Sequence, residues 1–300
     1  MQEGSQKAIF YALFANFGIA LTKSWGAWFT GSGSMLAEAI HSFADTGNQA
    51  LLFLGLVQSR RLPDDEHPLG YGKLIYFWSF IVAILLFSMG GLFSIYAGVH
   101  KLGSPEPLKQ VWVGLLILSL AVVMEGSAMF GVLTEIRKLR RQMSLSQWLR
   151  TTRNAELVVV LGEDFAALIG LMLALIFLGL SGLTGDPLYD ALGSISIGVV
   201  LIIVSLFVAI RIKSLMVGKS AEPAILAEIQ RIIAGDPAIN RLLNTITIQV
   251  GPKVMLAAKI HMRSDLTIDQ AVERINALEE RLKKEVPEIG WCFVEPDCRD

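Results

Sequence analysis

Cysteine is nearly absent from the sequence, since only Cys292 and Cys298 occur among its 300 residues. Two thiols close to the C-terminus cannot form a disulfide framework or a four-thiolate zinc site, and they favour a reducing compartment. Charged residues are also scarce, at 18% of the chain, and the formal net charge is −1. Because binding to a phosphate backbone requires a positive field, we expect no nucleic-acid partner.

The short motifs of common enzyme classes are missing as well. The sequence contains no HExxH, GxSxG, Walker-type phosphate loop or GxGxxG pattern. Such patterns supply the metal ligands, the nucleophile or the phosphate cradle on which those reactions depend. We therefore expect a protein that is not an enzyme, and a membrane enzyme is the weakest of the alternatives.

Hydrophobic residues are what the sequence has in excess, at 53% of the chain with a mean hydropathy of +0.54. A helix that crosses a membrane needs about 20 mostly uncharged residues. Six stretches qualify, and we expect spans at about 7–29, 33–59, 74–100, 110–136, 154–181 and 188–212. The sequence thus predicts an α-helical integral membrane protein, a six-transmembrane-helix bundle in a lipid bilayer.

The C-terminal part differs from the rest of the chain. From Ser220 onward, charged residues are frequent and apolar residues occur in short patterned runs. In order, the patterns predict a helix over 223–234, strands over 245–250 and 253–262, a helix ending near Glu285 and a strand over 290–294. This order is typical of a ferredoxin-like α/β domain. We expect a membrane domain at 1–213 and a cytoplasmic ferredoxin-like domain at 214–300.

Positive charges in the short connections predict the orientation, because cytoplasmic loops carry an excess of Lys and Arg. These residues gather in the second and fourth connections and after the last span: Arg60, Arg61, Lys73, Arg137, Lys138, Arg140, Arg141, Arg150, Arg153, Arg211, Lys213 and Lys219. We interpret the first apolar stretch as a spanning helix, because it has full spanning length and lacks a clear signal-cleavage site. Both termini are therefore expected in the cytoplasm.

Ionisable residues inside the spans are the candidate functional residues, because each is costly in hydrocarbon without a partner. His41 and Asp45 stand four residues apart in the second span. An imidazole and a carboxylate one turn apart on one helix face form half of a site for a divalent cation. Asn48 continues that face. Asp164 on the fifth span can close the site, with Glu163 about 100° around the helix from it.

Other interpretations of the polar residues stay open. The pair on the second span can instead hydrogen-bond to each other and fix helix packing. Glu125, in the fourth span, is a packing contact, a proton carrier or a remote ligand. Glu38 is expected to be solvated at the membrane interface. Asp186 and Asp190, at the start of the sixth span, are interpreted as N-terminal caps or as charges that complement the helix dipole.

Four motifs, in order along the chain, carry a resemblance to a known family. They are AEAIHSFADTGNQ (37–49), DDEHPLGYGK (64–73), GED (162–164) before AALIG, and DPLYDALGSISIG (186–198). Together with the six expected spans, they make the sequence similar to the cation diffusion facilitator family. The HPLGYGK…YFWSF run (67–80) resembles the zinc-transporter-nine-like branch of that family.

The resemblance implies a homodimeric antiporter that exports Zn²⁺, or a similar ion such as Mn²⁺, Fe²⁺, Co²⁺ or Cd²⁺, from the cytoplasm in exchange for protons. It implies no cofactor besides the transported cation, and we place the protein in a bacterial inner membrane. Its transport ligands match His41, Asp45 and Asp164. The family's usual histidine on the fifth span falls at Val160. The fourth ligand then comes from Glu163, Asn48, Gln49 or water.

The family's loop metal site is matched only in part. Asp64 and His67 match two of its positions, whereas Tyr71 replaces a later histidine. The alternative is a solvated acidic turn that His67 only braces.

The family's C-terminal metal site is also matched in part. His261 and Glu295 match metal positions, while Leu243 and Phe293 stand where relatives have histidines. The missing histidine on the fifth span leaves an alternative function open, that of a non-transporting metal sensor or assembly partner.

Overall fold

The computed structural model describes residues 3–104, 108–140 and 142–299. Contacts divide the chain into two compact units. The first, here called the helical unit, comprises Met1–Gly55, Trp78–Gln142 and Glu156–Ile212. The second, called the sheet unit, comprises Leu56–Phe77, Met143–Ala155 and Lys213–Asp300. Two earlier segments of the chain thus pack with the C-terminal residues.

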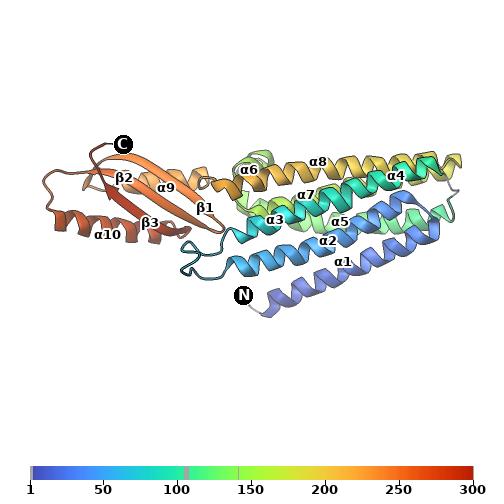
Figure 1. Cartoon of the computed structure of the whole chain (residues 1–300), viewed down its shortest axis with the longest axis horizontal. Coiled ribbons are helices and arrows are strands. Elements are labelled where there is room, and N and C mark those ends of the chain that lie inside the picture. Colours follow the sequence, from blue (N-terminus) through green and yellow to red (C-terminus); the bar gives the residue numbers. More distant parts are fainter. Residues whose placement is uncertain (1–2, 105–107, 141, 300) are drawn as a thin grey trace. The chain divides into compact units, whose positions relative to one another are not determined.

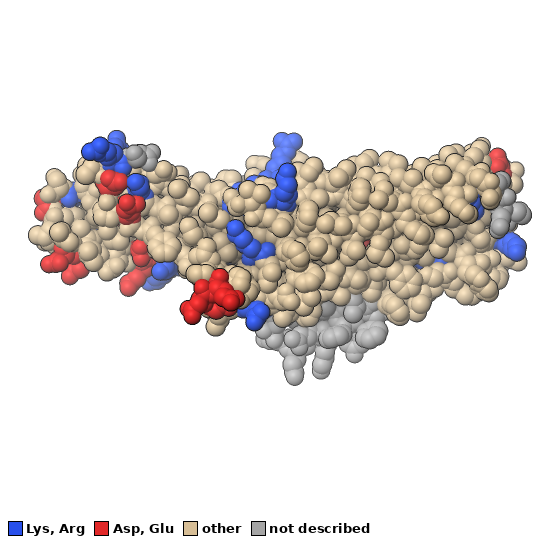
Figure 2. All heavy atoms as spheres, viewed as in Figure 1, with Lys and Arg blue, Asp and Glu red and all other residues tan. Residues whose placement is uncertain are grey.

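Long helices run side by side in the helical unit (Figure 1). Their bounds are α1 Glu3–Thr30, α2 Gly33–Ser59, α3 Leu74–Leu85, η1 Leu86–Leu92, α4 Phe93–Gly103, α5 Val111–Arg140, α7 Ala155–Thr184 and α8 Leu188–Gly218. On the face that Figure 2 shows, the described residues of these helices present almost no charged side chains except near the helix ends. Such a surface suits the hydrocarbon of a bilayer.

Four helical segments within the described residues are long and apolar enough to cross a membrane: Leu74–Gly103, Val111–Arg140, Ala155–Thr184 and a segment beginning at Leu188. The expected number of six spans is therefore not confirmed by length and composition. Polar residues explain why α2 is outside this set, since it carries Glu38, His41, Asp45 and Asn48. The chain is a helical membrane-type protein in which α2 is the polar helix.

The third expected span, 74–100, lies within the apolar helical segment Leu74–Gly103, but that segment is not α-helical throughout. Residues Leu86–Leu92 form a π-helix between α3 and α4, and the Phe93 backbone N–H donates to the Ser88 carbonyl, five residues earlier. The π-helix and α8 each contribute a glycine where they touch. A Cβ added at Gly91 of the π-helix would lie 2.5 Å from Ile202, and a Cβ added at Gly198 of α8 would lie 2.6 Å from the Gly91 carbonyl oxygen. Close helix packing of this kind requires small residues.

Asp190 joins three helices rather than capping its own. Its carboxylate accepts hydrogen bonds from the Ser32 hydroxyl (2.6 Å), the Gly33 N–H (2.6 Å) and the Ser34 N–H (3.3 Å) at the start of α2. It also pairs with the Lys101 ammonium of α4 at 2.5 Å. Asp190 is therefore not a cap of the sixth span, because its side chain satisfies the free N–H groups of α2 instead. It does lie in the first turn of α8, as the alternative of dipole complementation requires.

Asp186 does have the expected capping role. Its Oδ1 accepts a hydrogen bond from the Leu188 N–H, at 2.9 Å, where α8 begins.

The sheet unit contains the expected order of helices and strands. α9 covers Pro223–Ala234, β1 Ile239–Val250, β2 Lys253–Met262, α10 Ile268–Glu285 and β3 Ile289–Pro296. The sheet order is β1-β2-β3, with β1 antiparallel and β3 parallel to β2. Buried side chains of α9 and α10, among them Ile229, Ile233, Leu278 and Leu282, pack against Leu256 and Ile260 of the sheet. The short helix α6, Leu145–Thr151, was not expected from the sequence.

The turn between β1 and β2 contacts the segment before α3, within the sheet unit. Gly251 has a φ of +61°, and a Cβ added there would lie 2.5 Å from the Gly72 carbonyl oxygen. A Cβ at Gly72 would in turn lie 2.6 Å from the Val250 carbonyl oxygen. The Tyr76 hydroxyl donates to the Gly251 carbonyl at 3.2 Å. Only glycine allows the two backbones to approach this closely.

Replacing Gly251 with alanine tests this contact. Because the new methyl group meets backbone and the φ is unfavourable, Gly251→Ala is expected to lower the stability of the protein by about 1–3 kcal/mol. Thermal unfolding of the purified protein in detergent measures the change. Gly103→Ala is the control, because nothing lies within 4 Å of an added Cβ there. Equal melting temperatures for the two variants would contradict the prediction.

Candidate functional site

α2 presents the expected histidine–carboxylate pair to the interior of the helical unit. His41 is 1% exposed, and its Nε2 lies 3.5 Å from Asp45 Oδ2. Neither ring nitrogen of His41 has a hydrogen-bond partner among the described residues. A buried imidazole with unused nitrogens can accept a proton or bind a metal ion.

α7 contributes the second half of the candidate site. The Asn48 side-chain amide on α2 donates to Glu163 Oε1 at 2.6 Å. This bond joins the two helices that carry the expected ligands. Asp164 follows Glu163 on α7, and its Oδ2 is buried without a partner among the described residues.

A small cavity of about 50 Å³ lies where these side chains meet, and we call it the central cavity. Its volume suits one or two waters, or one ion that has lost most of its hydration. The side chains around it come from α1, α2, α5 and α7: Asn16, Ile19, Ser42, Asp45, Gln49, Glu125, Ala128, Val160, Glu163 and Asp164. Glu125, for which three interpretations were open, thus lines the same cavity as Asp45 and Asp164.

These carboxylates do not form a ready-made coordination sphere. Within the described residues, no three His, Cys, Asp or Glu side chains lie close enough together to hold a metal ion. His41 is not among the residues that line the central cavity, and a Cβ at Gly90 in the π-helix would lie 3.8 Å from its Nδ1. A complete ligand set therefore requires side chains or helices to move.

Sequence reasoning missed a buried ion pair beside the site. Glu38, expected to be solvated, is fully buried, so that expectation is wrong. The Lys23 ammonium lies 3.3 Å from Glu38 Oε2 and donates to the Ser42 hydroxyl at 2.7 Å. A lysine within the first apolar stretch was the available signal, because a charge at that depth requires a partner.

The loop between α2 and α3 is closed by its own hydrogen bonds. One oxygen of Asp64 accepts from the His67 N–H at 2.7 Å, and the other accepts from the Tyr71 hydroxyl at 2.6 Å. The Tyr71 bond holds the pKa of the Asp64 carboxyl below its usual range. The Arg61 guanidinium lies 4.9 Å from the centre of the Tyr71 ring. Asp64 and His67 thus lie in one turn, and the Tyr71 hydroxyl hydrogen-bonds to the other oxygen of Asp64.

In the C-terminal sheet, His261 and Glu295 lie on adjacent strands but are not directly opposite. His261 pairs with Arg241 of β1, and Glu295 pairs with Lys259 of β2. Both partners are cations, which does not favour a further cation between them.

The helices that carry the central cavity lie within the part of the chain that matches a known family. The cation efflux transmembrane domain model matches residues 9–216. The chain therefore belongs to the cation efflux family, as the four motifs indicated. Membership agrees with the expectation of a transporter rather than an enzyme.

Proteins similar in sequence to this chain include animal and plant proteins. The mitochondrial proton-coupled zinc antiporter SLC30A9 of Xenopus laevis is 35% identical over 93% of this chain and 49% of its own length. The human protein of that name is 31% identical over 96% of this chain and 51% of its own. Metal tolerance protein C4 of Arabidopsis thaliana is 30% identical over 90% and 60%. The first two confirm the resemblance to the zinc-transporter-nine-like branch, although this chain spans about half their length.

Among solved structures, a nickel form of a MamM CTD variant aligns with 26% of this chain and 98% of its own, at 18% identity and a TM-score of 0.24.

The hydrogen bond between Tyr71 and Asp64 has a consequence for titration. Tyr71→Phe removes the largest cause of the lowered pKa, so the pKa of Asp64 is expected to rise toward its ordinary value of 3.8. Because the folded pKa is the lower one, this bond stabilises the loop at neutral pH. That contribution is lost as the pH falls through the folded pKa. NMR titration of ¹³C-labelled aspartate in detergent measures the change, with Tyr96→Phe as the control. An unchanged Asp64 titration in Tyr71→Phe would refute the assignment.

Proposed function

We propose that this chain is a proton-coupled antiporter that exports Zn²⁺, or a similar divalent cation, from the cytoplasm. The central cavity carries this proposal: acidic side chains from α2, α5 and α7 surround one ion-sized space inside apolar helices. Membership of the cation efflux family and the similarity to proteins named as zinc antiporters support it. His41, Asp45, Asp164 and Glu163 are the proposed metal ligands, and Asn48 positions Glu163 through its hydrogen bond.

Exchange follows from competition for the same lone pairs. A divalent ion binds neutral imidazole and ionised carboxylates, whereas protons occupy those same nitrogen and oxygen atoms. Loading the metal therefore releases protons, and loading protons releases the metal. Because His41 and Asp164 are not yet in one ligand set, we infer that the helices shift between a loaded and an unloaded arrangement.

The wider architecture belongs to the same proposal. α1 and α2 join the four apolar segments to make six spans, with the Lys- and Arg-rich connections and both termini in the cytoplasm. Residues 214–300 form the cytoplasmic ferredoxin-like domain after a transport domain at 1–213, and two chains form a homodimer. The bacterial inner membrane, where we place the protein, supplies the inward proton gradient that drives export.

Partial metal sites in the loop and the C-terminal domain receive less support. Both oxygens of Asp64 are already used within its turn, and His261 and Glu295 each pair with a cationic residue. The proposed transport therefore depends on the central cavity alone.

Removing either aspartate of the central cavity tests the proposed function. Asp45→Ala and Asp164→Ala are each expected to reduce metal-dependent proton flux in proteoliposomes by about 100-fold, because each loses a direct ligand. Glu135→Gln, at an exposed position near the end of α5, is the matched control and keeps the wild-type flux. Folded wild-type protein that binds metal without flux would instead favour the metal sensor or assembly partner.

Val160 tests the chemistry of metal selection, because it lines the central cavity where the family's histidine falls. An added imidazole favours Zn²⁺ over the harder Mn²⁺. Val160→His is therefore expected to raise the ratio of Zn²⁺ to Mn²⁺ affinity by about tenfold, equal to about 1.4 kcal/mol. Calorimetric titration with each ion measures the ratio, and Val160→Ile is the apolar control. A ratio that stays at the wild-type value would show that position 160 does not reach the metal.

A further inference from the structure

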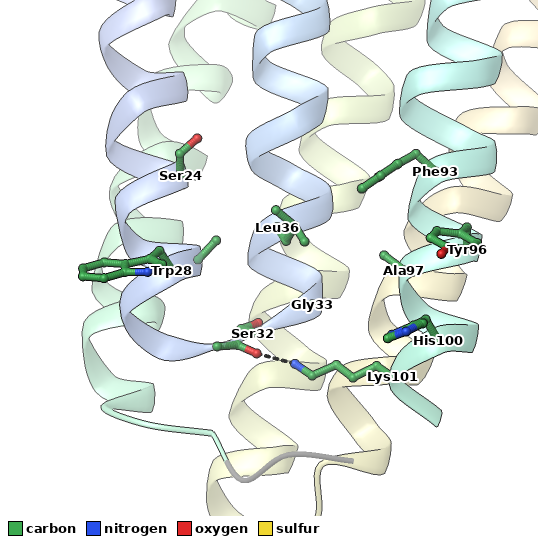
Figure 3. Close-up of a pocket in the computed structure, with 12 residues that line it drawn as sticks. Ser24, Trp28, Ser32, Gly33, Leu36, Phe93, Tyr96, Ala97, His100 and Lys101 are labelled. Atoms are coloured by element: carbon green, nitrogen blue, oxygen red, sulfur yellow. Dashed lines mark hydrogen bonds between the residues drawn. The ribbon is translucent and has the colours of Figure 1, made fainter. Parts of the chain in front are cut away.

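Two cavities lie along the same pair of helices in the helical unit. The central cavity touches α2 at Ser42 and Asp45. A larger cavity of about 560 Å³, called the outer cavity, touches α2 at Gly33 and Leu36 and lies among α1, α2 and α4 (Figure 3). From Leu36 to Ser42 the helix rises about 9 Å, at about 1.5 Å per residue. The segment of α2 between Leu36 and Ser42, with the side chains packed against it, therefore separates the two cavities, and we call it the closed layer.

The outer cavity has a polar end at the level where α2 begins. Lys101 lies there beside Ser32 and Gly33, and its ammonium donates to the Gly31 carbonyl at 2.5 Å (Figure 3). Lys109, just before α5, donates its N–H to the Thr30 carbonyl near this end, so the basic last turn of α5 (Arg137, Lys138 and Arg140) lies at the other end of the helical unit. The proposed orientation places that basic turn in the cytoplasm. In that orientation the outer cavity lies on the exterior side of the central cavity.

The closed layer contains the ion pair of Lys23 and Glu38. Both side chains are fully buried, and the Lys23 ammonium lies between Glu38 Oε2, at 3.3 Å, and the Ser42 hydroxyl, at 2.7 Å. The α7 backbone completes the layer, since a Cβ added at Gly170 would overlap Glu38 Oε1. Ser42 also lines the central cavity, so the ion pair directly adjoins it.

The ion pair leaves one carboxylate oxygen without a partner. Glu38 Oε1 is buried and accepts no hydrogen bond within the described residues. A buried ion pair is weak as a packing device, because well-packed apolar residues are often as stable. Charged residues inside membrane helices instead mark ion pathways. Glu38 and Ser42 supply oxygen ligands, and a divalent cation that binds them must take the place of the ammonium.

We propose that Glu38 is a second, transient site for the transported divalent cation, between the central and outer cavities, and that Lys23 is a tethered cation that occupies it between transport events. The inference rests on the proposed antiport function. While Lys23 is paired with Glu38, the layer is closed and charge-balanced. The outgoing metal ion displaces the ammonium, binds Glu38 and passes into the outer cavity.

Metal stoichiometry tests the site without relying on transport. In Lys23→Met, Glu38 loses its cation, and the full-length protein is expected to bind one more Zn²⁺ per chain than wild type by equilibrium dialysis in detergent. Adding Glu38→Gln to this variant is expected to remove the extra ion. Lys109→Met, an exposed lysine of the same unit, is the control and keeps the wild-type stoichiometry. No extra ion in folded Lys23→Met protein would overturn the proposal.

Glu38→Gln alone provides a second test, because it keeps the shape of the side chain and does not depend on the folding of Lys23→Met. It is expected to keep the wild-type Zn²⁺ stoichiometry and affinity while Zn²⁺ flux in proteoliposomes falls by about tenfold or more, since a carboxylate on the exit path is lost. Wild-type flux in this variant would overturn the inference, as would loss of metal binding, which would make Glu38 part of the primary site. If wild-type protein carries no metal, the proposed function fails, and the extra ion in Lys23→Met still decides whether Glu38 is a cation site.

Discussion

The high energy of an unpaired charge inside a membrane helix is the constraint on which the rest of this structure depends. The buried polar residues of the helical unit obey it in pairs. Lys23 pairs with Glu38, and Lys101 pairs with Asp190. Asn48 of α2 bonds Glu163 of α7. Each contact joins two helices, so the ion pairs and the hydrogen bond that satisfy these buried groups also hold the bundle together.

Several buried polar atoms near the central cavity, including one oxygen of the paired Glu38, nevertheless lack a partner in the described part of the chain. Within the described residues, His41, Asp45, Asp164 and Glu38 all retain buried side-chain atoms without a hydrogen-bond partner. Unsatisfied atoms of this kind are costly, and several of them beside one cavity indicate a place where a ligand or proton is exchanged. Glycines permit the movement that exchange requires. At Gly91 and Gly198 the helix backbones approach closely, with the side chains of Ile202 and Ile95 packed over the two glycines.

The sequence predicted those features that depend on local pattern. Hydrophobic length placed the long helices, and the range 33–59 coincides with α2. The spacing of four residues placed His41 and Asp45 one turn apart. The partners of Glu38 and Asp190 were not predicted, because they lie on other helices and helical periodicity does not show which faces meet. The π-helix beside His41 also escaped prediction, since it lies within one apolar span and hydrophobic length does not distinguish a π-helix from an α-helix.

The central claim is that metal and protons compete for one set of buried atoms, and its most direct test is the direction of transport. Wild-type protein in proteoliposomes, loaded with a Zn²⁺-sensitive dye and given equal total Zn²⁺ on both sides, would be exposed to a pH gradient of either sign. The account predicts net Zn²⁺ movement against the direction of proton flow, and reversal of that movement when the gradient is reversed. Zn²⁺ movement that does not respond to the gradient would contradict the claim.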